Sequence, residues 1–280
     1  MLIHGKLLSF PINVLPDHEH IYHADRTVAH VEDEIRKGWK DSFTEKSFFI
    51  EDWYEIVIDS IREKGGKMLL FESFTGGLVA PENDNNLWNY KFTWNPRNVV
   101  LAGQGGAAMF IQEGTYKYIP YHKLFRRTEF LNINGSGNYE AYANRDSLKY
   151  RSIYGLDGIP TMYRGTIRKV GFSRAWNIFV QLGMTDDSYT IQNSESMSYR
   201  DFVNLFLAYS PSDSVELKLR SYLNIDQDDL MWAKLIELDL FNPTKKIKLK
   251  NATPAQILQK ILEDSWTLEE KEKDMIVMQH

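Results

Sequence analysis

Residues 161–182 read TMYRGTIRKVGFSRAWNIFVQL, and the period of the apolar residues changes within this stretch. Residues 161–170 favour a β-strand, because they are rich in Thr, Tyr, Ile and Val. From Trp176 onward, Phe179 and Val180 recur at the spacing of one face of an α-helix. The change of period predicts a border between a region of sheet and a region of helices.

The part of the chain before this border is predicted to be mostly sheet. A helical pattern of apolar residues, Tyr54, Val57, Ile58 and Ile61, ends at the glycine pair 65–66. Short runs rich in aromatic residues and Thr follow this helix, and Gly, Asn and Pro separate them, which is typical of strands joined by turns. The predicted strands are residues 67–75, 90–94, 98–101, 116–120 and 161–170.

The part after the border is predicted to be a small helical subdomain, about residues 172–242, inserted into the sheet region. Capping patterns at Ser198 and at Thr253 each begin a helix. Residues 274–280, DMIVMQH, leave no polar face, so we expect a strand that lies inside the sheet. The predicted fold class is α+β, a mixed β-sheet flanked by helices, with no Rossmann domain visible.

The bulk composition excludes several classes of function. The chain has 280 residues, no cysteine and a net charge of −5. Disulfides, thiolate metal sites and a cysteine nucleophile are therefore excluded. Acidic residues outnumber basic ones, which argues against nucleic acid as the main partner. The apolar run 7–14 is too short to span a bilayer and lacks a small-residue cleavage site, so we expect a cytoplasmic protein with no membrane partner.

A glycine-rich stretch resembles a cofactor-binding loop. Residues 98–109, NVVLAGQGGAAM, contain the G-x-G-x-x-A spacing of a dinucleotide-binding turn. Such a turn must open a helix, but Gly114 follows too soon, and residues 113–115 are typical of a hairpin turn. We therefore expect a turn between strands and no cofactor site here.

Three histidines lie close together in the sequence DHEHIYH, residues 17–23. Imidazoles and neighbouring carboxylates are ligands for zinc or nickel. The spacing of His18, His20 and His23 fits no helix face, however, so we expect a solvated loop and no metal site.

The arginines between residues 144 and 168 form the most informative group. On a strand, Arg164, Thr166 and Arg168 alternate to one face, and Arg145 lies in the loop-like segment NRDS. Guanidinium groups beside a hydroxyl suit the planar, two-point recognition of a carboxylate. The alternative is a solvated sheet face with surface ion pairs, and the spacing alone does not decide between the two.

Five stretches agree in order, spacing and letters with one known family. They are GGLVAPE (76–82), YKFTW (90–94), YANRDS (142–147), YRGTIR (163–168) with the Gly-Phe pair at 171–172, and DMIVMQH (274–280). Together they resemble the saccharopine dehydrogenase (NADP, L-glutamate-forming) family of the aminoadipate lysine pathway. The resemblance covers about residues 60–280. We therefore divide the chain into an unrecognised segment, 1–46, and a substrate-binding domain of that family, 47–280.

The resemblance implies which residues contact the substrate, although it gives no catalytic residue. Saccharopine carries several carboxylates, and Arg145 and Arg168 would hold them. Thr166 would donate a hydrogen bond, and Trp94 would form a wall of the pocket. Thr75 stands where the family has a substrate-contacting cysteine. The implied substrate-binding residues are Thr75, Trp94, Arg145, Thr166, Ile167 and Arg168.

The resemblance also implies a cofactor that this chain does not visibly hold. In the family, a separate Rossmann domain binds NADP(H), and no strand–GxGxxG–helix unit is visible here. The implied chemistry is hydride transfer at the imine–amine bond that joins glutamate to aminoadipate semialdehyde. We expect NADP in the complete enzyme, but no cofactor and no turnover in this chain alone.

Two further expectations concern partners. The alternative function is a non-catalytic fragment that binds a dicarboxylate amino acid or a partner chain. A surface that the cofactor domain would otherwise cover tends to pair with another copy, so we expect a homodimer or a larger homo-oligomer.

Overall fold

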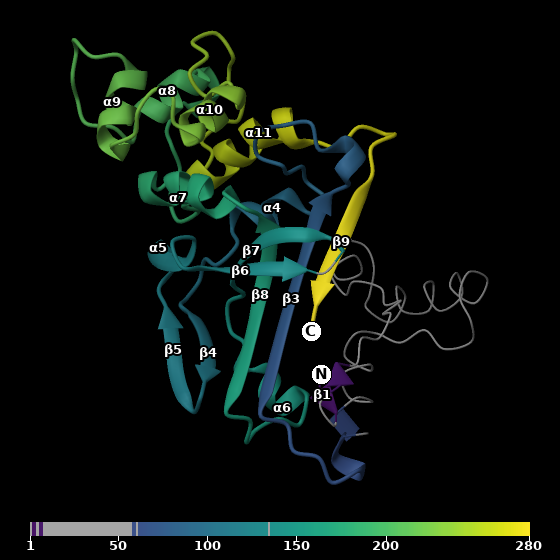
Figure 1. Ribbon diagram of the computed structural model, residues 1–280. Coiled ribbons are helices and arrows are strands. Elements are labelled where there is room, and N and C mark those ends of the chain that lie inside the picture. The colour runs from purple at the N-terminus through teal and green to yellow at the C-terminus, as the bar shows by residue number, and fades with distance from the viewer. Residues whose placement is uncertain (1, 4–5, 8–57, 60, 134) are drawn as a thin grey trace.

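The computed structural model describes residues 2–3, 6–7, 58–59, 61–133 and 135–280 (Figure 1). The predicted loop of His18, His20 and His23 and most of the unrecognised segment 1–46 lie outside the described residues. Residues 58–59 and 61–63 are helical, and the Gly66 N–H donates to the Ile61 carbonyl at 2.8 Å. This bond confirms that the first helix of the domain ends at the glycine pair 65–66.

The centre of the described structure is a seven-stranded mixed sheet. Strand β3 runs parallel to β8, and the other pairs are antiparallel, with the order β5-β4-β8-β3-β9 and with β7 joining β6 to β8. Figure 1 shows the hairpin β6–β7 crossing in front of the two long strands β3 and β8, so the sheet is curled. Its strands are β3 (Leu70–Val79), β4 (Ala108–Gln112), β5 (Thr115–Ile119), β6 (Thr128–Ile133), β7 (Gly137–Ala143), β8 (Thr161–Lys169) and β9 (Asp274–Gln279).

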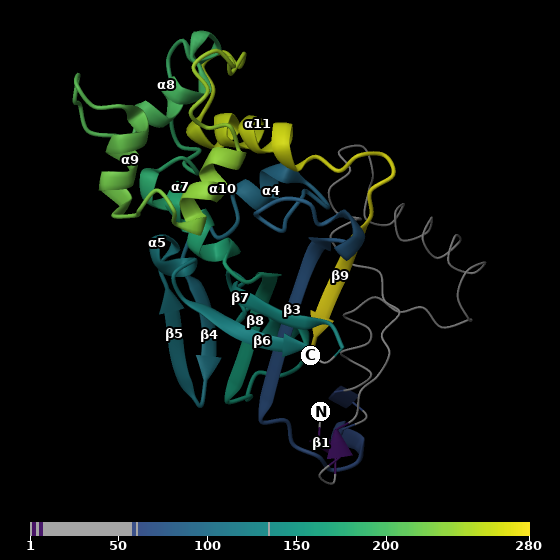
Figure 2. The same cartoon turned by 45° about the horizontal axis from the view of Figure 1, so that its top comes forward.

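Helices α4 and α7 to α11 gather at one end of this sheet, whereas α6 lies near the other end (Figure 1, Figure 2). Besides the helical residues 58–59 and 61–63, the α-helices of the described residues are α4 (Pro96–Val100), α5 (Tyr121–Leu124), α6 (Tyr150–Ile153), α7 (Phe172–Leu182), α8 (Tyr199–Asn204), α9 (Val215–Leu223), α10 (Leu230–Glu237) and α11 (Pro254–Trp266). Two 3-10 turns, η1 (Pro81–Asn83) and η2 (Ser194–Ser196), and the two-residue strands β1 (Leu2–Ile3) and β2 (Lys6–Leu7) complete them. Helices α7 to α10 occupy the stretch 172–242 in which a helical subdomain is predicted, and the α+β fold class is confirmed. Within the described residues, no helix is both long and apolar enough to cross a membrane.

The joint between the sheet and the helices lies where the sequence changes period. Gly171, with φ of 89°, turns the chain from β8 into α7 and has no side chain to cap the helix. The buried carboxylate of Glu140, on β7, accepts hydrogen bonds from the N–H groups of Gly171 at 2.9 Å and Ser173 at 2.6 Å. A carboxylate at this place satisfies orphan donors and is stabilised by the helix dipole.

A cluster of aromatic rings joins α7 to α11 and to the segment before α4. The Trp88 ring lies 5.8 Å from Phe179 and 5.1 Å from Trp266, measured between ring centroids. The Phe172 and Trp176 rings stack at 5.7 Å. Close aromatic pairs of this kind add to the free energy gained by burying their area, so these five rings form the centre of the core.

Residues 98–101 form no strand, and that prediction is wrong. The side chain of Asn95 accepts hydrogen bonds from the N–H groups of Arg97 and Asn98, and Pro96 occupies the first turn, so the segment begins helix α4. An Asn-Pro pair is a helix-start signal, and here it overrides the β-branched residues that follow. The predicted strand 90–94 is also absent, because its Phe92 makes only an isolated bridge to Thr267.

Strand β9 lies at the end of the described sheet rather than inside it. Among the described residues it pairs with β3 alone. Both of its faces contact apolar clusters, through Met275 on one side and Met278 on the other. Ile276 is nevertheless 37% exposed, so a run without a polar face does not here indicate a central strand.

The capping role of Glu140 predicts a loss of stability when its carboxylate is removed. Glu140→Ala leaves two helix N–H groups without an acceptor, and we expect the free energy of unfolding to fall by at least about 1–3 kcal/mol. Chemical denaturation measures this change. Glu270→Ala, at an exposed position, is the control and should shift it by less than about 0.5 kcal/mol. Equal effects of the two changes would contradict the capping role.

Candidate functional site

Thr75 and Thr166 lie side by side at the centre of the sheet. They are register partners in the parallel pair β3–β8, so their side chains point to the same face. Both residues are half-buried. On the other side of Thr75, the register partner is Met278 of β9. The structure thus brings two of the predicted site residues together as a pair of neighbouring hydroxyls.

The segment that carries Trp94 crosses the same face of the sheet. Gly77 shares this face with Thr75, since alternate residues of a strand point the same way. A Cβ on Gly77 would lie 2.5 Å from Thr93 Oγ1, so only a glycine permits this close approach. Trp94 itself is half-buried and packs against the main core. Its neighbour Thr93 therefore lies against the face that carries Thr75.

Arg168 also points to this face but is 3% exposed. Its Cζ lies 5.0 Å from the centroid of the Tyr90 ring, 5.4 Å from that of Phe172 and 5.9 Å from that of Tyr142. Such distances give favourable cation–π contacts. The guanidinium is therefore enclosed by aromatic rings. It does not lie on a solvated sheet face, which was one of the two alternatives that the sequence left open.

Two polar atoms inside this aromatic enclosure have no hydrogen-bond partner. Arg168 Nη1 donates to the Ile167 carbonyl at 2.9 Å, whereas Arg168 Nε and the Tyr90 hydroxyl are buried and unpaired. Glu140 is the cross-strand neighbour of Arg168, but its oxygens accept from backbone N–H groups. Burial raises the pKa of Tyr90 to about 12, although Arg168 acts in the opposite direction. Unpaired buried donors of this kind are a feature of binding sites.

Ile167 lies on the opposite face from Thr166 and Arg168. It is fully buried in the main core, as the alternation of a strand requires. Its carbonyl oxygen nevertheless holds the Arg168 guanidinium. The side chain of this predicted site residue is therefore directed away from Thr75, Thr166 and Arg168.

Arg145 follows the end of β7 in a strained conformation. Its φ is 35°, in the left-handed region that L-residues rarely adopt. The surroundings fix it, because its carbonyl accepts from the Met109 N–H at 2.7 Å and its Nη2 donates to the Leu101 carbonyl at 3.3 Å. Its side chain is exposed. Local strain held by neighbouring bonds is common at functional sites.

Arg164 shares its face with Thr166 and Arg168, as predicted, and is held by an aromatic ring. Its Cζ lies 3.7 Å from the centroid of the Tyr150 ring. Among the described residues, neither Arg164 nor Arg168 forms a salt bridge. Stacking on aromatic rings, rather than pairing with surface acids, places both guanidinium groups.

The glycine-rich segment forms a turn that is followed by a strand. Residues 108–112 are β4, and the hairpin turn at Glu113-Gly114 is confirmed. Gly103 has φ of 82°, and a Cβ there would lie 2.4 Å from Leu124 Cδ2. Packing against α5 therefore explains this glycine. In the described part of the chain, no group of three His, Cys, Asp or Glu residues is arranged to hold a metal ion.

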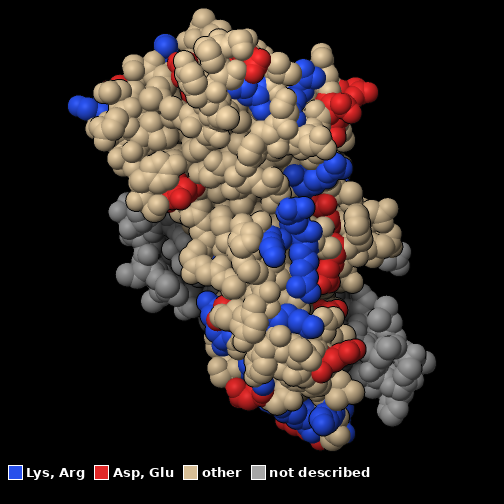
Figure 3. All heavy atoms as spheres, turned by 90° about the vertical axis from the view of Figure 1, so that its left-hand side faces the viewer, with Lys and Arg blue, Asp and Glu red and all other residues tan. Residues whose placement is uncertain are grey.

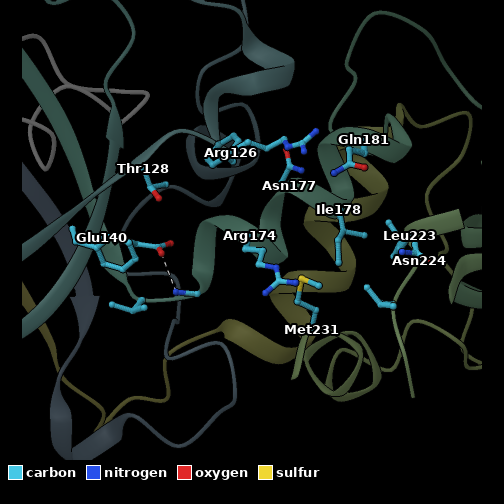
Figure 4. A pocket seen from close by; sticks show the side chains of 15 residues that line it. Arg126, Thr128, Glu140, Arg174, Asn177, Ile178, Gln181, Leu223, Asn224 and Met231 are labelled. Carbon is cyan, nitrogen blue, oxygen red and sulfur yellow. Dashed lines mark hydrogen bonds between the residues drawn. The ribbon is translucent and has the colours of Figure 1, made fainter. Parts of the chain in front are cut away.

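A hollow of about 690 Å³ lies between the sheet and the helices and is lined by none of the six predicted site residues (Figure 4). Its walls come from the ends of α5 and α9, from β6 and β7, and from one side of α7 and α10; among them are Arg126, Glu140, Arg174, Asn177 and Met231. The sequence predictions missed it. The lining residues are spread from Phe125 to Met231 and match no sequence motif.

Taken together, these features define an α+β domain with a curled mixed sheet, a helical cap and an arginine enclosed at the joint. Comparison with known proteins identifies the family of this domain. The chain belongs to the family of saccharopine dehydrogenase C-terminal domains, whose model matches residues 54–280.

Curated relatives of this chain are fungal and mammalian enzymes. The saccharopine dehydrogenase (NADP(+), L-glutamate-forming) of Saccharomyces cerevisiae is 28% identical over 80% of this chain and 51% of its own length. That of Schizosaccharomyces pombe is 29% identical over 82% of this chain and 53% of its own length. The mitochondrial alpha-aminoadipic semialdehyde synthase of Mus musculus is 28% identical over 79% of this chain and 24% of its own length.

A solved structure agrees with these matches. The apo saccharopine dehydrogenase (L-Glu forming) from Saccharomyces cerevisiae superposes with a TM-score of 0.68, at 27% identity, over 81% of this chain and 51% of that one. The chain therefore spans about half the length of the fungal relatives that it matches. The family assignment expected from the five sequence stretches is confirmed.

The unpaired hydroxyl of Tyr90 predicts an unusual response to substitution. Tyr90→Phe removes a buried group that has no partner, so we expect the free energy of unfolding to stay unchanged or to rise by about 1–2 kcal/mol. Tyr199→Phe is the control, because Tyr199 is also a buried residue and its hydroxyl donates to Asp264 at 2.6 Å. Its loss should lower the free energy of unfolding by about 1–3 kcal/mol. Similar losses in both variants would show that the Tyr90 hydroxyl is bonded in solution.

Proposed function

We propose that this chain is the substrate-binding domain of a saccharopine-dehydrogenase-like oxidoreductase of lysine metabolism. The family match over residues 54–280 carries the proposal. The arrangement of Thr75, Thr166 and Arg168 on one face of the sheet supports it. In the complete enzyme, a hydride would pass between NADP(H) and the carbon of the imine–amine bond that joins glutamate to aminoadipate semialdehyde.

The residues of this chain would bind and orient the substrate. Arg168 offers an unpaired Nε donor in an enclosure from which water is largely excluded, where a charge-assisted hydrogen bond is strong. Arg145 would hold a second carboxylate, and the hydroxyls of Thr75 and Thr166 would fix polar groups between them. Trp94 would bound the same space. Such positioning supplies much of the rate when the cofactor performs the chemistry.

The NADP cofactor of the complete enzyme would bind elsewhere. The glycine-rich segment 103–108 leads into strand β4 rather than into a helix N-terminus, so it does not form the cradle that a pyrophosphate needs. We also propose the homo-oligomer expected from the sequence. Among the described residues, β9 leaves one edge without a strand partner.

Substitution of the enclosed arginine tests the substrate site. Arg168→Lys keeps the charge but loses the planar donors and the broad ring contacts. We expect the affinity of the chain for saccharopine, measured by calorimetric titration, to fall about ten- to hundredfold. Arg220→Lys is the matched control. Arg220 also lies over an aromatic ring, that of Trp232 at 5.6 Å, but it belongs to helix α9 and not to the sheet. Unchanged affinity in Arg168→Lys would overturn the assignment.

Titration with NADPH tests whether this chain binds the cofactor by itself. We expect the chain alone to show no saturable binding, because its glycine-rich turn leads into strand β4 rather than into a helix N-terminus. Calorimetry with the full chain measures this directly. Saturable binding at micromolar concentration would contradict the proposal. A Gly105→Ala variant would then show whether the turn is responsible, since a methyl group there meets no protein atom within 4 Å and only the φ of 89° strains the substitution.

A further inference from the structure

The sheet face that carries Thr75 and Thr166 continues into a second polar row. Ser73 and Arg164 are register partners in the pair β3–β8, two residues before the pair of hydroxyls, so all of these side chains point the same way. His280, which follows the last residue of β9, extends this row, because its Nδ1 lies 3.2 Å from Ser73 Oγ. The row lies about 7 Å along the strands from the pair of hydroxyls, and none of the six predicted site residues belongs to it.

Arg164 supplies the hydrogen-bond donors of this row, and its nitrogen atoms are open to solvent. Its Cζ lies 3.7 Å from the centroid of the Tyr150 ring, and its side chain forms no hydrogen bond or salt bridge with any described residue. The residue is half-buried, yet none of its nitrogen atoms is among the enclosed atoms that lack a hydrogen-bond partner. The planar guanidinium is therefore held by a ring and can still donate to a ligand.

The backbone of Arg164 is fixed by the loop that follows β7. Its N–H donates to Ser147 Oγ at 3.0 Å, and its carbonyl accepts from the Asn144 N–H at 2.8 Å. These bonds tie the loop that carries Arg145 to the same row. A side chain that a fixed backbone and a ring already position loses little conformational entropy when it binds a ligand.

The surroundings of Arg164 favour a carboxylate. Lys149 is exposed and contacts the same Tyr150 ring, with its Nζ 5.1 Å from the centroid. The acid of this loop, Asp146, accepts hydrogen bonds from two backbone N–H groups of its own segment. Figure 3 shows one face of the molecule on which basic side chains form a band with acidic side chains beside them. Among the described residues, however, no salt bridge neutralises Arg145, Lys149 or Arg164, so this region keeps a positive charge.

Arg164 and Arg168 flank the pair of hydroxyls at equal distances. Each lies two residues from Thr166 along β8, one on either side, so their Cα atoms are about 13 Å apart. The next register pair on this face before Arg164 is Phe71 and Met162, and both are buried in an apolar cluster apart from the main core. The polar strip therefore ends at Arg164, and an elongated ligand that lies along it would have a guanidinium near each end.

We propose that Arg164 binds a carboxylate at one end of the ligand and so selects ligands that carry carboxylates at both ends. This inference rests on the function proposed above, because it places the middle of the ligand at the pair of hydroxyls. Saccharopine carries one more carboxylate than Arg145 and Arg168 hold there, and Arg164 takes the remaining one. Its planar fork donates parallel hydrogen bonds to this carboxylate, while the Tyr150 ring lies against the guanidinium.

Calorimetric titration of the full chain with saccharopine tests the role of Arg164. Arg164→Gln should weaken the binding of saccharopine about ten- to hundredfold, and Arg164→Lys, which keeps the charge but loses the fork, should give an intermediate affinity. Lys149→Gln is the matched control, because it removes a cation that contacts the same ring, and it should change the affinity by about twofold or less. Unchanged affinity in Arg164→Gln would overturn the proposal, and so would equal losses in Arg164→Gln and Lys149→Gln, which would mean a diffuse charge effect.

Two half-molecules of the ligand test the selection for carboxylates at both ends. Nε-propyllysine keeps the lysine half of saccharopine, and N-pentylglutamate keeps the glutamate half. In NMR titrations of the parent chain, both should bind at least about tenfold more weakly than saccharopine. Arg164→Gln should reduce the preference for saccharopine over one half about tenfold and keep the preference over the other. A half-molecule that binds the parent chain as tightly as saccharopine would overturn the selection, and equal reductions for both halves would contradict a single carboxylate at Arg164.

Variants of Tyr150 decide the matter if Arg164→Gln fails to fold. Tyr150→Leu removes the ring but keeps the guanidinium, and it should weaken saccharopine about fivefold. Tyr150→Phe keeps the ring and should bind as the parent chain does. Equal affinities of the two variants would show that the ring does not position Arg164 and would overturn the proposal.

The same titrations separate this inference from the proposed function. A loss of saccharopine binding in Arg168→Lys together with unchanged binding in Arg164→Gln would overturn the role of Arg164 alone. Absence of saccharopine binding by the parent chain would overturn both.

Discussion

The carboxylate of Glu140 is buried at the joint between β8 and α7, where it accepts hydrogen bonds from the N–H groups of Gly171 and Ser173. A buried charge is costly unless it is hydrogen-bonded, and here the first turn of a helix supplies the donors. The bond ties β7 to α7 and so fixes the helices on the end of the sheet. Since Gly171 has no side chain of its own, no nearer residue replaces this cap.

Two polar regions lie on either side of this joint. On the sheet side, Arg168 is enclosed by rings and retains an unpaired donor, and the hydroxyl of Tyr90, one of these rings, is unpaired as well. On the helix side, Asn177 retains an unpaired acceptor at the wall of the hollow. Both groups belong to side chains that are almost fully buried in the core.

Local signals in the sequence predict much of the architecture. The capping boxes of α8 and α11 are formed as their residues indicate, because a cap depends on groups only three residues apart. Strand β8 and helix α7 lie where the period changes. The prediction of a strand at residues 98–101 is wrong. The apolar residues there suit a strand, but the Asn95-Pro96 pair before them starts a helix.

The sequence by itself determined the family, the order of the main elements and which residues of β8 share a face, because alternation along a strand is a local property. Only the tertiary structure decided that Arg168 is enclosed by Tyr90, Tyr142 and Phe172. It also decided that β9 ends the described sheet and that a hollow opens beside Asn177. Depth of burial and the shape of a cavity depend on side chains far apart in the chain, and their packing leaves no periodic signal in the sequence.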